Sequence, residues 1–384
     1  MAVAQNEIAI VGGGIGGLIV GYGLHQEGYD VHIYEQAPEY KDIGGHLTMD
    51  SPTVEVLARW GLDEPFKEIS CELNGMEVRN IDDGGVITHF QYPSLGALGV
   101  DDPNDTGIRI LRAFLRPDFL DMVTSRMPKE RLHTNHRLVA LENAEDYATA
   151  VFENGERVQA SVILGADGVH SIARNMFDKA EAHAAGHTIL RTLCNGDVLP
   201  EDYPNDRMRF WDGWKYGDKE NQIGFHVLTV PVREGRYVSV DLQFMGGDQL
   251  EDCHPQDVPI ERVEARYPDT MDPVIQSMVD ARLEPITVHS LYDRRVSTSW
   301  VGGRIAIMGD AAHSMRPNLG QGACQSIHDA GQLVASINEL GPGAEALKHY
   351  EAIRKPYVES IVETAKNTMP DPKKWKDKGQ NDAA

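Results

Sequence analysis

Residues 7–36, with the sequence EIAIVGGGIGGLIVGYGLHQEGYDVHIYEQ, restrict the possible folds of this 384-residue chain more than any other segment. An apolar run of buried-strand length comes first and leads into a glycine-rich turn. The glycines Gly12, Gly14 and Gly17 complete the pattern G-x-G-x-x-G. A helix is expected over 18–27, and the strand after it ends at Glu35. The segment therefore predicts a β-α-β unit at the start of a parallel sheet.

The chemistry of this unit is that of a dinucleotide site. Its glycines let the backbone approach a pyrophosphate, and the start of a helix favours the negative charge of that group. Glu35 stands where a carboxylate accepts hydrogen bonds from a ribose diol. The pattern alone does not choose between NAD and FAD. The residues expected to contact the cofactor here are Gly12, Gly14, Ile15, Gly16, Gly17, Glu35 and Gln36.

Two later segments favour FAD over NAD. In 160–177, an apolar strand is followed by Asp167–Gly168. In 304–337, a strand ends at Gly309–Asp310, and a glycine-rich loop leads to a helix that starts near Gly322. An acid at a strand end can bind sugar hydroxyls, and unpaired N–H groups at a helix start favour negative charge. FAD contains a pyrophosphate, a ribose, a polyol and an anionic ring edge, whereas NAD would leave the last segment unexplained.

Together, these three motifs resemble the signature of the single-component FAD-dependent aromatic hydroxylases, the para-hydroxybenzoate hydroxylase type. The resemblance runs from about residue 7 to 364 and is weak between 175 and 289. It implies that Asp310 binds the ribityl chain and that Asp167 and Gly168 serve both FAD and NAD(P)H. It also implies a flavin-contacting arginine at Arg116, with Arg112 as a rival. Further cofactor contacts are expected at His46, Gly309, Pro317, Gly320, Gly322, Ala323 and Cys324.

The resemblance and the strand patterns predict an α/β fold with a Rossmann-like FAD-binding domain and a mostly antiparallel substrate sheet. A hairpin over 75–90 and strands near 207–211, 223–232 and 236–245 alternate in polarity, which suits a sheet with one covered face. The FAD-binding domain is expected to comprise 1–74, 91–185 and 286–340, and the substrate sheet 75–90 and 186–285. Residues 341–368 are expected to form a C-terminal helix, followed by a flexible tail over 369–384.

The resemblance implies a monooxygenase that consumes NAD(P)H and O2. One oxygen atom would enter an electron-rich aromatic or heteroaromatic ring through a flavin C4a-hydroperoxide. The sequence contains no second G-x-G-x-x-G, so the nicotinamide cofactor, NADH or NADPH, is expected to bind transiently. Epoxidation of a polyene, a flavin-dependent reduction and a flavin-free binding scaffold remain as alternatives.

The reacting groups are expected beside the flavin and on the substrate sheet. His46 stands where the family commonly has glycine, and it either lies over the isoalloxazine ring or turns to solvent. A base that deprotonates a phenol would be His46 or His226. The candidate catalytic residues are His46, His226 and Pro317, and the candidate substrate contacts are Trp211, Thr229 and Tyr237.

The segment GFHVLTVPVREGRY, residues 224–237, bears on the charge of the substrate. Hydroxybenzoate relatives clamp the ring carboxylate with a strand arginine, and Pro231 falls at that place. We therefore expect a larger, neutral or weakly charged ring or polyene. A shift of one residue in the strand register would turn Arg209 or Arg236 inward and restore a clamp.

Charge and cysteine content exclude several partners. The formal net charge of -23 argues against nucleic acid and anionic membranes. The four cysteines show no spacing typical of a metal or redox pair, so no metal site is expected. No secretory segment or apolar run of transmembrane length is found. We expect a cytoplasmic enzyme, a monomer or homodimer, that acts on a small molecule.

Overall fold

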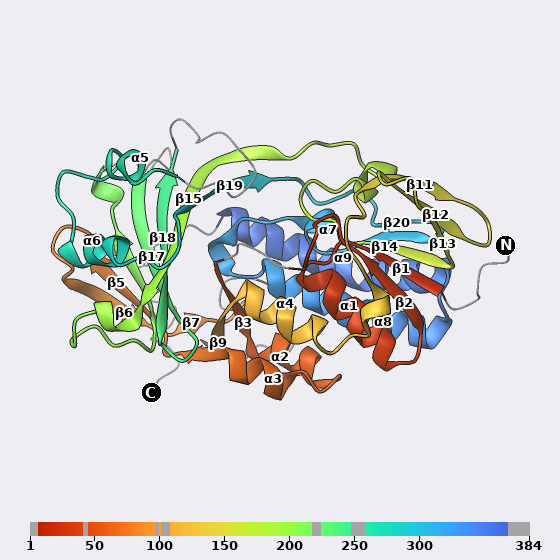
Figure 1. Cartoon of the computed structure of the whole chain (residues 1–384), viewed down its shortest axis with the longest axis horizontal. Coiled ribbons are helices and arrows are strands. Elements are labelled where there is room, and N and C mark those ends of the chain that lie inside the picture. Colours follow the sequence, from red (N-terminus) through yellow and green to blue (C-terminus); the bar gives the residue numbers. More distant parts are fainter. Residues whose placement is uncertain are drawn as a thin grey trace.

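The computed structural model describes residues 7–40, 45–96, 100, 108–216, 224–246 and 258–367. Two sheets dominate this part of the chain, a mostly parallel one of six strands and a mostly antiparallel one of seven. Figure 1 shows the first sheet toward the right, beside α1 (Ile15–Gln26), α8 (Gly322–Leu340) and α9 (Ala344–Asn367), and the second toward the left. The predicted α/β fold with two kinds of sheet is confirmed.

The six-stranded sheet has the order β10-β2-β1-β14-β21-β20. Its strands are β10 (Leu132–His133), β2 (Asp30–Tyr34), β1 (Glu7–Val11), β14 (Val162–Gly165), β21 (Ile305–Ile307) and β20 (Val301–Gly302). All neighbours pair in parallel except β20 and β21. The run 8–11 in β1 is buried throughout, as expected for a parallel strand covered on both faces. Helix α8 packs between α1 and α9, so the C-terminal helix belongs to the same hydrophobic core.

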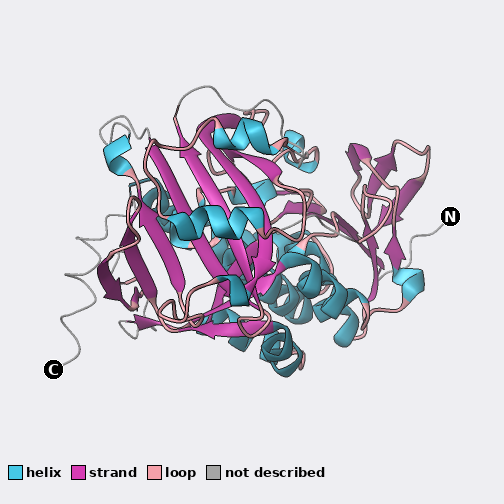
Figure 2. Cartoon of the chain, turned by 60° about the vertical axis from the view of Figure 1, so that its left-hand side comes forward, coloured by secondary structure: helices cyan, strands magenta, loops and turns pink. Residues whose placement is uncertain are grey.

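The seven-stranded sheet has the order β19-β15-β18-β17-β16-β5-β6, and only β16 and β5 pair in parallel. Its strands are β19 (Thr287–Asp293), β15 (His183–Asn195), β18 (Tyr237–Met245), β17 (Gly224–Val232), β16 (Met208–Asp212), β5 (Met76–Asn80) and β6 (Val86–Phe90). Figure 2 shows α5 (Ile260–Glu264) and α6 (Pro273–Asp280) lying on one face of this sheet. We call the face under α5 and α6 the outer face and the opposite one the inner face.

Smaller elements fill the space between and beside the two sheets. A three-stranded sheet joins β3 (His46–Asp50), β9 (Leu111–Leu115) and β4 (Ser70–Leu73), and β7 (Tyr92–Pro93) pairs with β8 (Ile108–Arg109). The helices of this layer are α2 (Ser51–Ala58), α3 (Asp63–Ile69) and α4 (Arg116–Thr124), and α7 (Asp310–His313) follows β21. The strands β11 (Leu138–Asn143), β12 (Ala148–Phe152) and β13 (Arg157–Ala160) form a separate antiparallel sheet at the end of the molecule that holds the six-stranded sheet (Figure 1).

Side-chain alternation on the seven-stranded sheet separates two environments. Leu190 on β15 and Leu242 on β18 belong to the core beneath α6, on the outer face. Their neighbours Ile189 and Gln243 point to the inner face and line a cavity. Both faces are therefore covered, the outer one by helices and the inner one by the part of the molecule that contains the six-stranded sheet.

Two sequence-based expectations fall outside the described residues, namely the start of the strand at Ile223 and the tail 369–384. The division into domains remains a prediction, and the packing of α9 on α8 joins the C-terminal helix to the core of the six-stranded sheet. None of the helices in the described ranges combines the length and the apolar character needed to cross a membrane.

Candidate active site

A cavity of about 470 Å³ lies where the carboxyl ends of the parallel strands meet the inner face of the seven-stranded sheet. The predicted cofactor residues that line it from the first half of the chain are Gly14, Ile15, Gly16, His46, Arg116 and Gly168. Those from the second half are Gly309, Asp310, Pro317, Gly320, Gly322 and Ala323. Segments about 300 residues apart in the sequence therefore border one space. Six other predicted residues do not line the cavity: Gly12, Gly17, Glu35, Gln36, Asp167 and Cys324.

The first glycine loop has the form that a dinucleotide requires. Gly12 has a φ of +109°, and a Cβ there would overlap the carbonyl oxygen of Ala166. A Cβ on Gly17 would overlap the carbonyl oxygen of Gly12, so both positions demand glycine. Within the described chain, no side chain caps the start of α1, and Gly14, Ile15 and Gly16 border the cavity. The N–H groups of this first turn can therefore bind a pyrophosphate.

Two charged residues lie close to the glycine loop. Arg116, the first residue of α4, places its Nη2 atom 3.6 Å from the Cβ position of Gly14, where it would face a pyrophosphate. Its rival Arg112 turns away, donating to Ser70 Oγ at 2.9 Å and to Glu72 at 3.1 Å. Glu35 accepts hydrogen bonds from the Gly13 N–H at 2.6 Å and the Ala37 N–H at 2.9 Å. Its carboxylate therefore orders the loop, and its contact with a ribose stays a prediction.

The last motif presents an acid and a helix start to the same cavity. Asp310 begins α7 and is exposed, and Gly309 before it has a φ of +58°. The first turn of α8 contributes Gly322 and Ala323, and no side chain in the described part of the chain caps this helix. A polyol beside Asp310 and an anionic ring edge at α8 match these groups. The residues present thus fit FAD.

The side chains of two motif residues, Asp167 and Cys324, are held within the protein and do not line the cavity. The Asp167 carboxylate accepts hydrogen bonds from Ile172 N–H at 2.7 Å and Ala173 N–H at 3.0 Å, and burial raises its pKa. This carboxylate ties the turn after β14 to the next helical segment, so only Gly168 of the pair lines the cavity. The Cys324 side chain is fully buried behind the first turn of α8. Any contact from Cys324 to the flavin would therefore use its backbone.

His46 lies at the junction of the two sheets, among three polar side chains of β15 and β18. Its Nδ1 atom is 3.0 Å from Ser239 Oγ and 3.9 Å from Asp241 Oδ1. Burial lowers the pKa of His46 to about 4, while Asp241 acts in the opposite direction. The imidazole is therefore neutral at physiological pH. The ring lines the cavity and does not turn to bulk solvent.

Arg191, which is half-buried, forms an ion pair with the buried Asp241 beside His46. Arg191 donates from Nε and Nη2 to the two oxygens of Asp241 at 2.7 and 2.8 Å. Although burial alone would raise the pKa of Asp241, Arg191 and His46 hold it below its ordinary value. A Cβ on Gly45 would overlap the Arg191 side chain, so this glycine makes room for the pair. The pair comes from adjacent strands and leaves the Arg191 charge matched.

Arg109 is a second cavity arginine that sequence reasoning missed. Its Nε atom donates to the Pro93 carbonyl at 2.9 Å and its Nη1 atom to the Leu319 carbonyl at 3.3 Å. The same Nη1 atom forms a long ion pair with Asp50 Oδ2, at 4.0 Å. No partner among the described residues is found for Nη2. Arg109 therefore brings a positive charge to the cavity, held in place by two carbonyl groups and paired with Asp50 only at the long distance of 4.0 Å.

The structure does not bring the predicted substrate contacts to this cavity. Trp211 and Thr229 lie on the outer face, where Trp211 donates to Asp272 at 2.8 Å. Tyr237 packs in a separate cluster near the hairpin at 232–237. His226 is buried behind Phe210, with 5.0 Å between the ring centroids. The inner-face residues that line the cavity are instead Met76, Ile189, Arg191, Met208, Phe210, Leu228, Asp241 and Gln243.

Comparison with known proteins shows the family of this chain. Residues 5–365 match the model of the FAD binding domain family, and the chain belongs to that family. It is 28% identical over 362 residues to 3-amino-4-hydroxybenzoate 2-monooxygenase of Streptomyces cremeus, covering 94% of this chain and 86% of that protein. It is 27% identical to salicylate hydroxylase of Pseudomonas putida, covering 94% and 84% of the two chains.

A solved structure shows the same fold. Klebsiella pneumoniae HpxO, in complex with FAD and uric acid, superposes with a TM-score of 0.78 at 23% identity, covering 99% of this chain and 90% of that one. The resemblance to the FAD-dependent aromatic hydroxylases is confirmed. The chain is an FAD-dependent monooxygenase, an oxidoreductase whose electron donor is NAD(P)H.

Removing the Asp310 carboxylate should weaken FAD binding. In Asp310→Ala, a hydroxyl of the ribityl chain loses a charged acceptor, which is worth about 1.5–3 kcal/mol, or roughly 10- to 150-fold in the dissociation constant. Flavin fluorescence on dilution of the loaded protein measures that constant. Asp121→Ala, at an exposed acid on α4 outside the cavity, is the matched control. Unchanged FAD affinity in Asp310→Ala would remove this carboxylate from the site.

Proposed function

We propose that this enzyme hydroxylates the ring of a small phenolic aromatic acid, with O2 and NAD(P)H as co-substrates. The observation that carries this proposal is a cavity bordered by both a neutral histidine and an arginine, Arg109, whose ion pair with Asp50 is long at 4.0 Å. The names of several relatives point to such substrates, including 3-amino-4-hydroxybenzoate, salicylate and 6-hydroxynicotinate. Bound FAD supplies the redox chemistry, in which NAD(P)H provides two electrons, one oxygen atom enters the ring and the other leaves as water.

Arg109 would hold the substrate carboxylate. A planar guanidinium matches a carboxylate in geometry, and a charge-assisted hydrogen bond is about twice as strong as a neutral one. Because carbonyl oxygens of Pro93 and Leu319 fix the side chain, little conformational freedom is lost on binding. A neutral substrate was expected from the sequence because the segment 224–237 has no arginine at the place of the clamp. Arg209 is fully buried on the outer face and Arg236 lies outside the cavity, so the cation comes from β8 instead.

His46 would accept the proton of the phenolic hydroxyl. When Nδ1 carries the ring proton and donates to Ser239 Oγ, Nε2 keeps a lone pair for that proton. A ring carbon ortho or para to a phenolate is more electron-rich than one in the neutral phenol. The phenolate formed would be an anion beside the ring, and such an anion raises a histidine pKa. Asp241, 3.9 Å from Nδ1, further favours the imidazolium.

The walls of the cavity favour a single aromatic ring over a polyene. Met76, Met208, Phe210 and Leu228 line it from the inner face of the sheet and exclude water from the reacting atoms. The cavity volume of about 470 Å³ covers the space beside the residues that would face the flavin as well as the space beside those that would face the substrate. Ligand pockets commonly span ~300–1000 Å³ for one molecule, so the space left beside a flavin ring is small.

A substrate panel tests this proposal. We expect slow oxidation of NAD(P)H without substrate, and a marked rise with hydroxybenzoates or hydroxynicotinates, accompanied by oxygen uptake. Isotopically labelled O2 should place one labelled atom in the product. Neutral phenols and polyenes form the comparison set, because the larger neutral ring or polyene expected from the sequence is the second candidate. Efficient turnover of those compounds alone would overturn the proposal that the substrate is an acid.

A further inference from the structure

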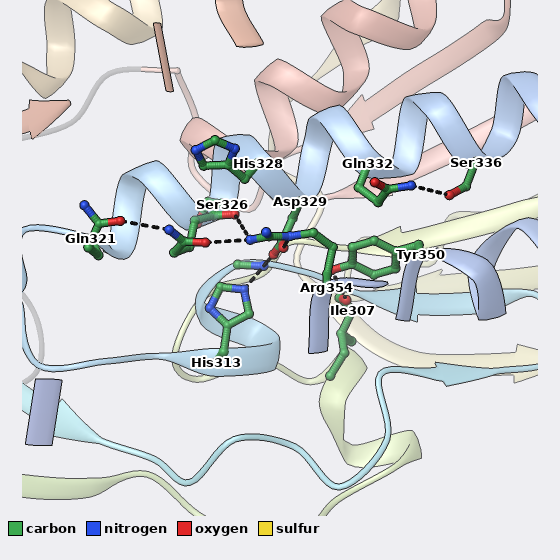
Figure 3. A network of polar contacts seen from close by, with 12 residues as sticks. Ile307, His313, Gln321, Ser326, His328, Asp329, Gln332, Ser336, Tyr350 and Arg354 are labelled. Atoms are coloured by element: carbon green, nitrogen blue, oxygen red, sulfur yellow. Dashed lines mark hydrogen bonds and ion pairs between the residues drawn. The ribbon is translucent and has the colours of Figure 1, made fainter. Parts of the chain in front are cut away.

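A buried carboxylate behind the cavity, Asp329 on α8, joins three separate segments of the flavin side (Figure 3). Its Oδ2 atom accepts hydrogen bonds from the Gly309 N–H at 3.0 Å and from His313 Nε2 at 2.6 Å. Its Oδ1 atom accepts from Arg354 Nε, on α9, at 2.8 Å. Asp329 has no solvent exposure, so the cost of burying its charge must be offset by these donors.

The same network continues to the other end of the cavity. Arg354 Nη2 donates to Gln325 Oε1 at 2.7 Å, and Gln325 Nε2 donates to Gln321 Oε1 at 2.8 Å. Gln321 Nε2 then donates to Asp50 Oδ2 at 2.9 Å. Because arginine can only donate and a carboxylate can only accept, the two ends fix the orientation of both amides. The chain of bonds thus fastens the residue before α8 to the end of β3.

We propose that Asp329 is a positioning residue for FAD, which holds the Gly309–Asp310 turn so that the Asp310 carboxylate faces the ribityl chain. This inference goes beyond the proposed substrate and does not depend on it. It also gives the C-terminal helix a part in the flavin site, because Arg354 supplies the counter-charge of Asp329.

The geometry of the turn explains why a carboxylate is needed. Gly309 has φ +58° and ψ −143°, a backbone conformation that residues other than glycine rarely adopt. A Cβ at this position would also lie 2.8 Å from Ser326 Oγ. A hydrogen bond from its N–H to a fixed acceptor selects this conformation. Asparagine at 329 would keep one oxygen, but its NH2 group would then face donors in place of the other oxygen. Either the Gly309–Asp310 turn or Arg354 would then lose its acceptor, and the tie between the turn and α9 would be broken.

The experiment is a double-mutant cycle on FAD affinity in the full chain. Asp329→Asn should raise the FAD dissociation constant by about tenfold or more, the scale of a lost charge-assisted hydrogen bond. In the Asp310→Ala background the same change should have little further effect, because Asp329 acts through Asp310. Effects that multiply in the double variant, or an unchanged dissociation constant, would overturn the proposal. The visible circular dichroism of bound flavin should change in Asp329→Asn even when FAD is saturating.

Two further variants separate positioning from general stability. Glu77→Gln breaks a comparable buried pair, with Arg79 at 2.7 Å, on the outer face of the large sheet. It should lower stability without changing the FAD dissociation constant, and an equal loss of FAD in this control would refute a specific role for Asp329. If Asp329→Asn does not fold, Arg354→Lys keeps the charge but loses the bonded pair geometry. Arg354→Lys should weaken FAD binding in the wild-type background but not in the Asp310→Ala background. An FAD affinity equal to that of the wild type would contradict the positioning role of Asp329.

Discussion

Replacing His46 by glutamine is expected to lower kcat on a phenolic acid by about 10²–10⁴-fold, the usual contribution of a general base. Glutamine can still hydrogen-bond Ser239, but it cannot take up the phenolic proton. FAD affinity should change little, because the backbone of the flavin-binding loops is untouched. Single-turnover kinetics with a hydroxybenzoate measure the effect. A loss smaller than threefold would show that the hydroxyl ionises without this residue.

The pH dependence of turnover tests whether His46 acts as a neutral base. The folded pKa of His46, about 4, lies below the ordinary value of 6.5, so the imidazole is deprotonated and active across the neutral range. Wild-type turnover should therefore show no loss as the pH falls from 8 to about 6 on account of this group. In His46→Gln, activity should rise with pH, as the substrate ionises in solution before binding. His226→Gln is the matched control and should leave this profile unchanged, since His226 is buried outside the cavity.

The flavin side could be predicted because its chemistry is local in sequence. The glycine spacing in β1–α1, the acid at the end of β21 and the start of α8 are each contained within about 20 residues. Such motifs fix backbone conformations, as the positive φ of Gly12 and Gly309 shows. Parallel strands then bring their carboxyl ends to one edge, so the three motifs meet without any knowledge of long-range register.

The substrate side could not be predicted in the same way, because its residues meet through strand pairing. Arg191 and Asp241 are cross-strand neighbours on β15 and β18, and Arg109 comes from a two-residue strand. Alternation within β16 offered no choice between Phe210 and Trp211, since both faces of the sheet are covered. The helices α5 and α6 pack apolar side chains on the outer face, so burial alone does not tell the two faces apart. The order of the strands, rather than the residue types, decides which face meets the flavin.

Arg109→Met should reduce kcat/KM for an aromatic acid by about 30- to 5000-fold. Loss of one partner of a buried charged pair costs about 2–5 kcal/mol. Here the variant removes the guanidinium, so the carboxylate of the bound substrate is left without its partner. The matching neutral phenol, which lacks the carboxylate, should be turned over by the variant as it is by the wild type. Steady-state kinetics on the two substrates give this ratio directly. Arg109→Lys keeps the charge but not the planar fork, so its kcat/KM for the acid should lie between those of the wild type and of Arg109→Met.

The comparison of acid with neutral phenol also controls for the structural contacts of Arg109. Its bond to the Leu319 carbonyl borders the loop that carries Pro317 and Gly320, so the variant could disturb the flavin instead of the substrate. Such a disturbance would lower turnover of both substrates equally and raise the FAD dissociation constant. Arg236→Met removes an arginine outside this cavity and should alter neither substrate. A selective loss for the acid, with FAD affinity unchanged, is the result that assigns the carboxylate to Arg109. Equal losses for acid and phenol would reject that assignment.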